Sequence, residues 1–322
     1  MKLGWIRFGL EELNFLKSFR DLKILCGKMV YLLPRVTGTF NRYTKVPPSL
    51  QIEPTNHCNL DCTCCSASRS KRKKGYMDFE LFQRIINDAS QIGVKRVHLY
   101  LHGEPMLHPQ IVEMVGHIKS KGLAVHLTTN GMPLNKEKMK AILQSGVNSA
   151  DRFIFSILGY SKDVHERIMK GVNHDRVIKN VYDFIELRRK HKMNGPVIET
   201  VFYTMPENER EIDQFFNYWH GVADHVTVVD SVSKQFSEFR TGGYSSIPVR
   251  KRTCINLWER MTIFWNGNVT TCIADVDGIC RLGSLKEKSI TEIWNCEKLL
   301  SIKKLHKEKS FQDLPLCSRC DW

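Results

Sequence analysis

The sequence predicts an α/β fold, in which a partial (β/α)6 TIM-like barrel is followed by a small C-terminal α+β domain. Between residues 50 and 230, six short apolar segments alternate with amphipathic segments of helical spacing. This alternation is typical of parallel strands joined by crossover helices. With 322 residues, of which 42% are hydrophobic, the chain can bury a barrel-sized core. After residue 253 the pattern changes to a hairpin, a helix and a cysteine pair.

The elements of the barrel follow from the spacing of apolar residues. The six expected strands are 50–53, 96–101, 124–128, 152–157, 197–203 and 225–229. The helices expected between them are 78–92, 110–121, 136–144, 176–190 and 209–218. Asp78 is placed as the N-cap of the first of these helices. In barrels of this kind the chemistry gathers at the carboxyl ends of the strands, so the loops there are the places to search.

Four regions are expected along the chain. They are a helical extension at 1–48, a core barrel at 49–232, a polar connector at 233–253 and a C-terminal domain at 254–322. Leucines at helical spacing in the extension predict a helix that packs on its own domain or lies on a membrane surface. In the C-terminal domain, Asn266-Gly267 predicts a tight hairpin. Ser289 and Glu292 predict a capping box that begins a helix running to residue 305.

Composition restricts the classes of partner and the compartment. The net charge of +14 suits an anionic substrate, an acidic protein partner or a nucleic acid, and lysine-rich solvated helix faces also explain it. No RNA-binding module is visible, so we do not expect a nucleic-acid partner. There is no apolar run of transmembrane length and no secretory signal, which predicts a cytoplasmic protein. In that reducing compartment the eleven cysteines indicate metal ligation rather than disulfides.

The first cysteine cluster lies directly after the first expected strand. Cys58, Cys62 and Cys65 have the spacing C-x3-C-x2-C, with Cys64 as an additional thiol. Three soft thiolates on one short loop can hold three irons of a cubane cluster and leave the fourth iron open for an external ligand. The alternative is a zinc site, although zinc loops usually carry paired C-x2-C motifs.

This loop, together with three later segments, resembles the radical S-adenosylmethionine (SAM) superfamily. The three segments are His102-Gly103-Glu104-Pro105, Thr128-Thr129-Asn130-Gly131 and Phe155-Ser156-Ile157-Leu158-Gly159, and each lies at the carboxyl end of an expected strand. The resemblance implies that Cys58, Cys62 and Cys65 hold a 4Fe–4S cluster with an open iron. It also implies that Gly103, Glu104, Asn130 and Ser156 contact SAM. Cys64, His102 and Leu158 depart from the family pattern, in which these positions are usually aromatic, Gly and Asp.

A second cysteine cluster lies in the C-terminal domain. Cys254, Gly267, Cys272 and a Cys317-x2-Cys320 pair resemble the opening half of the SPASM domain, in its shorter Twitch form. That resemblance implies one auxiliary 4Fe–4S cluster held by Cys254, Cys272, Cys317 and Cys320. A structural zinc ribbon is the alternative. Cys280 and Cys296 lie outside the pattern, and Cys296 is expected to be a packed side chain inside the last helix.

The resemblance implies an enzyme that cleaves SAM reductively to a 5′-deoxyadenosyl radical, which then abstracts hydrogen from a substrate. We expect a small polar substrate, such as a sugar or an aminocyclitol, that is oxidised or epimerised. A maturase that modifies a peptide or protein is the main alternative, RNA modification is a weaker one, and a zinc-stabilised binding protein is the non-enzymatic one. The expected electron donor is a flavodoxin or a ferredoxin. The sequence does not identify the substrate, a general base, the roles of Cys64 and Cys280, or the oligomeric state.

Overall fold

The computed structural model describes residues 45–229, 253–318 and 320, and these belong to one compact unit, 45–322. The helix expected within 1–48 and almost all of the connector 233–253 lie outside the described residues. The proposed boundaries of the four regions therefore stay predictions.

A parallel sheet forms the centre of the unit, and it confirms the predicted α/β class. Its six strands are β1 (Ser49–Ile52), β3 (Arg96–Leu99), β4 (Ala124–Thr129), β5 (Arg152–Ser156), β7 (Val197–Tyr203) and β8 (His225–Val229). Each of them pairs in parallel with the next in this order. The sheet is open rather than closed, as a partial barrel requires.

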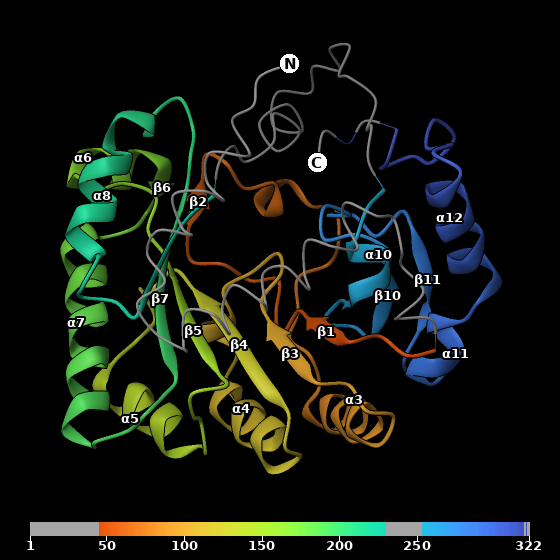
Figure 1. Cartoon of the computed structure of the whole chain (residues 1–322), viewed down its shortest axis with the longest axis horizontal. Helices are drawn as coiled ribbons and strands as arrows, with labels where there is room; N and C mark the ends of the chain where they lie inside the picture. The colour runs from red at the N-terminus through yellow and green to blue at the C-terminus, as the bar shows by residue number, and fades with distance from the viewer. Residues whose placement is uncertain (1–44, 230–252, 319, 321–322) are drawn as a thin grey trace, which may run out of the picture. The chain divides into compact units, whose positions relative to one another are not determined.

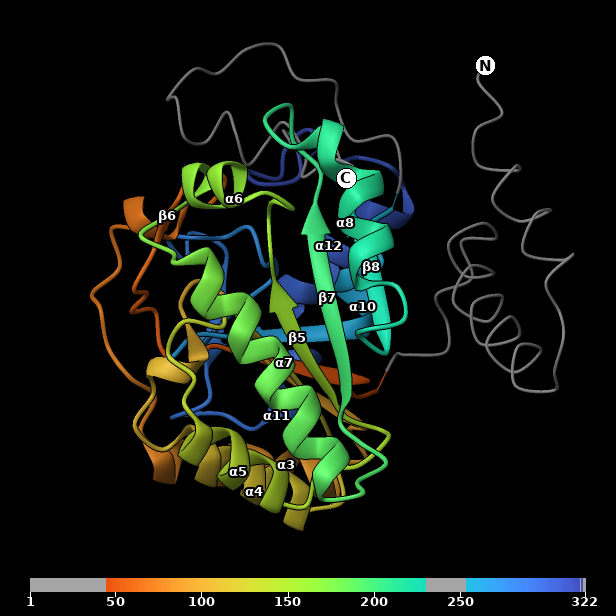
Figure 2. The same cartoon turned by 90° about the vertical axis from the view of Figure 1, so that its left-hand side faces the viewer.

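Helices cover one face of this sheet (Figures 1 and 2). They are α3 (Phe79–Gln91), α4 (Ile111–Ser120), α5 (Lys136–Gln144), α6 (Lys162–Ile168), α7 (His174–Lys190) and α8 (Ile212–Trp219). Asp78 caps α3 as predicted, because its side chain accepts a hydrogen bond from the Leu81 N–H. The short helix α6 was not predicted from the sequence.

Aromatic packing fixes α7 on the strands that it crosses. Phe184 of α7 and Phe153 of β5 are fully buried, and their ring centroids lie 4.5 Å apart. Phe155 lies 5.2 Å from Phe153 and extends the same cluster. Rings of this size dominate the apolar area that a core buries, so this cluster holds the carboxyl end of β5 in place.

The C-terminal segment continues the same sheet, which the sequence did not predict. It contains β9 (Arg260–Ile263), β10 (Asn268–Thr270), β11 (Arg281–Ser284), α10 (Asn256–Glu259), α11 (Ile290–Trp294) and α12 (Glu297–Lys307). Strand β9 pairs in parallel with β1, while β10 and β11 add antiparallel strands. The predicted hairpin is present, and Gly267 has the positive φ of 85° that its turn requires.

The last helix differs from its prediction. The capping box of Ser289 and Glu292 is present and begins α11, as predicted. However, the helix ends at Trp294, and a second helix, α12, begins after Cys296. Cys296 has an extended backbone (ψ 148°) at the N-cap of α12 and is half-buried, so it does not lie inside a helix.

Five shorter elements complete the fold. They are β2 (Asp61–Cys62), β6 (Met169–Lys170) and the 3₁₀ turns η2 (Ala67–Arg69), η3 (Pro105–Leu107) and η4 (Glu209–Glu211). Within the described part of the chain, no helix combines the length and the apolar character that a membrane span requires.

Candidate functional site

The loop that carries the first three predicted ligands is anchored at both ends. It leaves the carboxyl end of β1, and Cys62 lies in β2, which pairs with β6. The Thr63 N–H donates to the carbonyl of Ile168, 2.7 Å away. Between Cys62 and Cys65 the chain makes a tight turn, in which the Cys65 N–H donates to the Cys62 carbonyl. The loop therefore has a defined conformation in which its thiols are held close together.

The thiols of this loop lie close enough to raise one another's pKa. Burial raises the pKa of the Cys62 thiol well above its usual value, and Cys64, Cys65 and Cys58 raise it further. Cys58 is exposed, but protein atoms around its sulfur still desolvate it and raise its pKa to about 11, with Glu104 and Cys65 contributing. Such thiols are protonated at neutral pH, and a bound metal would displace their protons.

Gly103 lies where the loop after β3 meets the chain that leads to Cys58. A Cβ atom at Gly103 would lie 2.3 Å from the Thr55 carbonyl oxygen and 2.7 Å from that of His57. The next residue, Glu104, donates its N–H to the same His57 carbonyl over 2.8 Å. Only glycine permits this approach, which places Glu104 directly beside the thiol loop.

Glu104 is almost completely buried and accepts three hydrogen bonds. The Thr129 hydroxyl and the Met106 N–H donate to Oε1 over 2.7 and 3.0 Å, and the Asn130 N–H donates to Oε2 over 2.7 Å. Burial raises the pKa of Glu104 to about 7, although these hydrogen bonds oppose the increase. The carboxyl group therefore joins the ends of β3 and β4, and one acceptor position remains on Oε2.

Asn130 and Ser156 lie at the carboxyl ends of neighbouring strands. Thr129 of β4 pairs with Phe155 of β5, so the residues that follow them are side by side. The Asn130 side chain donates to Asn59 in the thiol loop over 3.0 Å. The Ser156 hydroxyl is half-buried and makes no hydrogen bond to another described residue. All four predicted SAM contacts thus lie along the edge of the sheet that the thiol loop covers.

A buried ion pair joins this edge to the C-terminal segment. Arg72 forms two hydrogen bonds of 2.8 Å with Glu53, which is completely buried at the end of β1. His102 lies 3.2 Å from Arg72 and places Nε2 2.7 Å from the Ile273 carbonyl, next to Cys272. Burial alone would raise the pKa of Glu53, but hydrogen bonds and charge from Arg72 and His102 lower it to about 2.

The second thiol cluster also converges. Burial raises the pKa of Cys272 well above its usual value, and the neighbouring thiols Cys254, Cys320 and Cys317 raise it further. The structure therefore brings together all four cysteines that the SPASM resemblance implies. Cys280 belongs to a different environment, in which burial and Asp275 raise its pKa.

His306 connects two of these cysteines and was not identified from the sequence. The Cys254 N–H donates to Nδ1 over 3.3 Å, which leaves the ring proton on Nε2, 3.3 Å from the Cys317 sulfur. The imidazole is completely buried, and its centroid lies 4.7 Å from that of Phe311. A fixed donor next to a predicted ligand sulfur is typical of an outer shell that orients ligands and adjusts a cluster.

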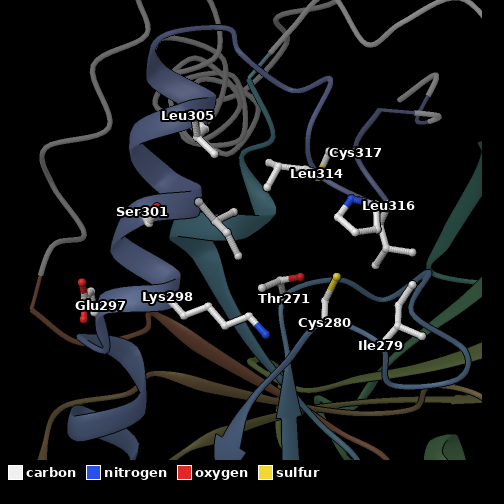
Figure 3. A pocket seen from close by; sticks show the side chains of 12 residues that line it. Thr271, Ile279, Cys280, Glu297, Lys298, Ser301, Leu305, Leu314, Leu316 and Cys317 are labelled. Atoms are coloured by element: carbon white, nitrogen blue, oxygen red, sulfur yellow. The ribbon is translucent and has the colours of Figure 1, made fainter.

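A pocket of about 460 Å³ lies between α12 and the loops that contain Cys280 and Cys317 (Figure 3). Its aliphatic lining includes Leu305 of α12 and, across the pocket, Leu316 of the loop that contains Cys317 (Figure 3). Lys298 extends toward the Cys280 side of the pocket and donates to the Arg281 carbonyl over 2.8 Å. The pocket adjoins the second thiol cluster at Cys317.

Both thiol clusters suit an iron–sulfur cluster by ligand type and register. Among the described residues, no group of three or more His, Cys, Asp or Glu side chains could hold a metal ion. A cubane distributes its thiolate ligands over separate irons, so its ligands are spaced more widely than those of a single ion. The converging thiols and the close approach at Gly103 fit such a group better than a zinc site.

Several residues of the site were not found from the sequence. Arg72 and Lys74 belong to the basic run 68–76, which directly follows the first thiol cluster and contributes to the net positive charge. In the structure, Arg72 is paired with Glu53, and the Lys74 ammonium donates to the Asn56 carbonyl over 2.7 Å. The sequence feature that could have predicted this ion pair is Glu53, because an acidic residue at the end of a buried strand needs a cationic partner.

The fold and the two thiol sites define a SAM-dependent iron–sulfur enzyme with an auxiliary cluster domain. Comparison with family models agrees: the radical SAM superfamily model matches residues 52–218, just over half of the chain, and an iron–sulfur cluster-binding SPASM domain matches residues 254–321. The chain belongs to the radical SAM superfamily. Its cofactors are a 4Fe–4S cluster, SAM and an auxiliary iron–sulfur cluster.

Two curated relatives are similar to this chain over most of their length. A tungsten-containing aldehyde ferredoxin oxidoreductase cofactor-modifying protein of Pyrococcus furiosus is 22% identical, covering 84% of this chain and 86% of the relative. The PqqA peptide cyclase of Gluconobacter oxydans is 24% identical, covering 80% and 78%.

Solved structures share the fold. SuiB of Streptococcus suis bound to S-adenosylmethionine has a TM-score of 0.65 at 17% identity, covering 93% of this chain and 78% of that one. BtrN in complex with AdoMet and 2-DOIA has a TM-score of 0.58 at 21% identity, covering 86% and 94%. These similarities confirm the partial barrel with its C-terminal domain.

Proposed function

We propose that this enzyme abstracts hydrogen from a small polar substrate, such as a sugar or an aminocyclitol, and thereby oxidises or epimerises it. One observation carries the radical chemistry: three converging thiols lie beside the buried Glu104, which joins the ends of β3 and β4. The superfamily membership supports the same chemistry.

In this proposal each residue of the site has a stated role. Cys58, Cys62 and Cys65 hold the 4Fe–4S cluster, while Gly103, Glu104, Asn130 and Ser156 contact SAM. When bound, the cluster and SAM supply the 5′-deoxyadenosyl radical that removes hydrogen from the substrate. Glu104 contributes its remaining Oε2 acceptor position to a cationic donor, as the amino group of SAM would be. The Thr129 and Asn130 hydrogen bonds hold that carboxylate in one orientation.

The inner face of the sheet, which is the face opposite the covering helices, favours a small polar substrate. Gln51 of β1, His126 of β4, Arg152 of β5 and Glu199 of β7 share this face by strand register, and Arg152 and Glu199 form a 2.6 Å ion pair. A polar face with closely spaced donors and acceptors can orient hydroxyl or amino groups. BtrN, whose structure contains the small molecule 2-DOIA, matches this chain over 94% of its own length, which supports a small-molecule substrate.

Modification of a peptide is the second candidate function, and the relatives favour it specifically. One of them is a PqqA peptide cyclase, and SuiB bound to precursor peptide SuiA has a TM-score of 0.64. The same site chemistry would then act on a side chain of a bound peptide.

The C-terminal segment and the electron supply complete the proposal. Cys254, Cys272, Cys317 and Cys320 hold the auxiliary cluster, which can accept an electron from the substrate radical or shape the substrate site. The net charge of +14 suits an acidic flavodoxin or ferredoxin as the donor. The abundance of thiols suits the cytoplasm.

Anaerobic turnover tests the proposal. Protein reconstituted with iron and sulfide is incubated with SAM and dithionite, and 5′-deoxyadenosine is measured. We expect formation by the wild-type protein and none by the triple variant Cys58→Ala, Cys62→Ala, Cys65→Ala. Cys296→Ala is the matched control, because Cys296 lies at the N-cap of α12, outside both thiol clusters, and it should retain activity. Product formed by the triple variant would contradict the ligand assignment.

Deuterium transfer then identifies the substrate class. Deuterated aminocyclitols, sugars and peptides are supplied in separate reactions, and the deoxyadenosine is analysed by mass spectrometry. Deuterium from an aminocyclitol or a sugar supports the first candidate function, and deuterium from a peptide alone supports the second.

A further inference from the structure

The inner face of the sheet carries three arginines near the amino ends of its strands. Arg260 of β9 and Arg96 of β3 both pair in register with Ser49 of β1, so they lie on the same face with one strand between them. Arg152 begins β5 and pairs with His126 of β4. Val97 and Leu99, on the opposite face of β3 from Arg96, are completely buried, whereas Arg96 and Arg152 are half-buried.

Two of these arginines lack an acidic partner among the described residues. Arg152 is paired with Glu199, but Arg260 donates only to the neutral Gln51 side chain over 2.9 Å. Arg96 makes no hydrogen bond or ion pair with any other residue that the structure describes, and the Nε atoms of Arg96 and Arg260 are both buried without a partner. A buried N–H donor without an acceptor is costly, and an anion held by the guanidinium would supply one.

Two histidines on the same face, His98 and His126, do not act as an anionic partner for the arginines. His98 is 6% exposed, and its Nδ1 atom also has no hydrogen-bond partner. Burial and the charges of Arg96, Arg152 and Arg260 lower the pKa of His126 to about 3, and burial and neighbouring cations lower that of His98 as well. Both rings are therefore neutral at pH 7, and each neutral ring retains one N–H donor. The unpartnered groups of this face lie on β3 and β9, the two strands that flank β1, and an acceptor with several oxygen atoms would complete their hydrogen bonds.

We propose that Arg96 and Arg260 bind an anionic group of the substrate, a phosphate or a carboxylate. This inference rests on the proposed function and extends it to the substrate class. The planar guanidinium forms paired hydrogen bonds with either anion, and neither arginine has an acidic partner among the described residues. The predicted SAM contacts lie at the opposite, carboxyl ends of the strands. The substrate would therefore be held by its charged end, with the reacting carbon toward Ser156.

Protection from an arginine reagent tests the site in the wild-type protein. Reconstituted full-length enzyme is treated with phenylglyoxal with and without inorganic phosphate, or with and without succinate, and modified peptides are quantified by mass spectrometry. We expect at least one of the two anions to slow modification of Arg96 and Arg260 saturably. Arg84 is exposed on α3 and makes no ion pair with a described residue, so its modification should not change. Phosphate and succinate distinguish the two anion classes. Equal modification rates with and without both anions would overturn the inference.

Substitution gives an independent measurement. Arg96→Gln and Arg260→Gln should each weaken anion affinity about tenfold, because one charge-assisted contact is worth roughly that factor. Arg96→Lys should recover part of the loss, and Arg84→Gln should have no effect. Iron content shows whether a variant has folded, and the Lys variant and the protection experiment decide the matter if a Gln variant does not fold. Unchanged anion affinity in folded Arg96→Gln and Arg260→Gln would contradict the assignment.

The two proposals fail in different ways. Wild-type enzyme that forms 5′-deoxyadenosine from SAM but shows no anion protection would contradict this inference alone. Wild-type enzyme that forms no deoxyadenosine would contradict the proposed function, whatever the anions do.

Discussion

Single residues determine how closely the loops of this site approach each other. Gly103 lets the chain after β3 lie against the backbone of residues 55–57, and Glu104 then reaches its three donors. The motif containing both residues was visible in the sequence. The reason why Gly103 must be glycine was not visible there, because the backbone that restricts it belongs to residues 55–57, almost fifty residues earlier.

Replacing Gly103 tests this close approach. Gly103→Ala should lower the free energy of unfolding by about 3 kcal/mol, because the new Cβ would overlap two carbonyl oxygens that cannot move independently. Urea denaturation of the metal-free protein measures the change. Gly116→Ala is the control: its Cβ would meet nothing closer than 3.9 Å inside α4, so it should be neutral or stabilising by about 0.5–1 kcal/mol. Equal effects of the two substitutions would contradict the steric explanation.

Glu53 should make stability depend on acid pH. Its pKa is lowered from 4.5 to about 2, so its contribution is complete above pH 4.5 and is lost as pH falls toward 2. Glu53→Gln should therefore destabilise the metal-free protein by about 3 kcal/mol at pH 7 and by progressively less below pH 4.5. Urea denaturation at pH 7 and pH 3 measures both differences. Glu186 is exposed, so Glu186→Gln serves as the control and should leave the free energy of unfolding unchanged at both pH values. If Glu53→Gln loses the same free energy of unfolding at pH 7 and at pH 3, the charge of Glu53 is unimportant for stability.

At the scale of elements, local patterns predicted most of the fold. The alternation of strands and helices, the Asp78 cap, the Asn266-Gly267 hairpin and the Ser289 capping box are all present in the structure. Each of these depends on residues close together in the chain. The break between α11 and α12 was missed because the apolar spacing continues across Asn295 and Cys296, and only their backbone conformation ends the helix.

His306 of α12 provides a prediction at this scale. His306→Phe keeps an aromatic ring against Phe311 but removes the donor next to Cys317. Hydrogen bonds to cluster sulfurs stabilise the reduced form, so the auxiliary cluster's reduction potential should fall by an amount on the order of 50 mV. An anaerobic redox titration followed by EPR measures the potential. The first cluster is an internal control whose potential should not change. A change in the reduction potentials of both clusters, or of neither cluster, would contradict a local role for His306.

At the scale of the whole unit, one sheet connects the two thiol clusters. Strand β9 pairs with β1, and His102 links Gly103 to the Ile273 carbonyl beside Cys272. The sequence predicted both thiol clusters but not this connection. Pairing between strands more than two hundred residues apart leaves no local pattern, and His102 appeared only as a departure from the usual glycine.

Removing the C-terminal segment should therefore damage the barrel. A chain ending at residue 253 would leave β1 as an open edge and Glu53 without its contact to Trp265. We expect this chain to aggregate and to unfold without a cooperative transition, because an unpaired, apolar edge strand invites association. Size-exclusion chromatography and thermal unfolding followed by circular dichroism measure both properties. A monodisperse fragment with a cooperative transition would show that the barrel folds independently.

The central claim is that Cys58, Cys62 and Cys65 hold a cluster whose remaining iron binds SAM. Pulsed EPR of the reduced protein with SAM labelled by ¹⁵N at its amino group and by ¹⁷O at its carboxylate tests this claim most directly. The account predicts hyperfine coupling of both labels to a 4Fe–4S cluster in the wild-type protein, and none in the Cys58→Ala, Cys62→Ala, Cys65→Ala variant. The absence of coupling in reconstituted wild-type protein, or its persistence in the triple variant, would contradict it.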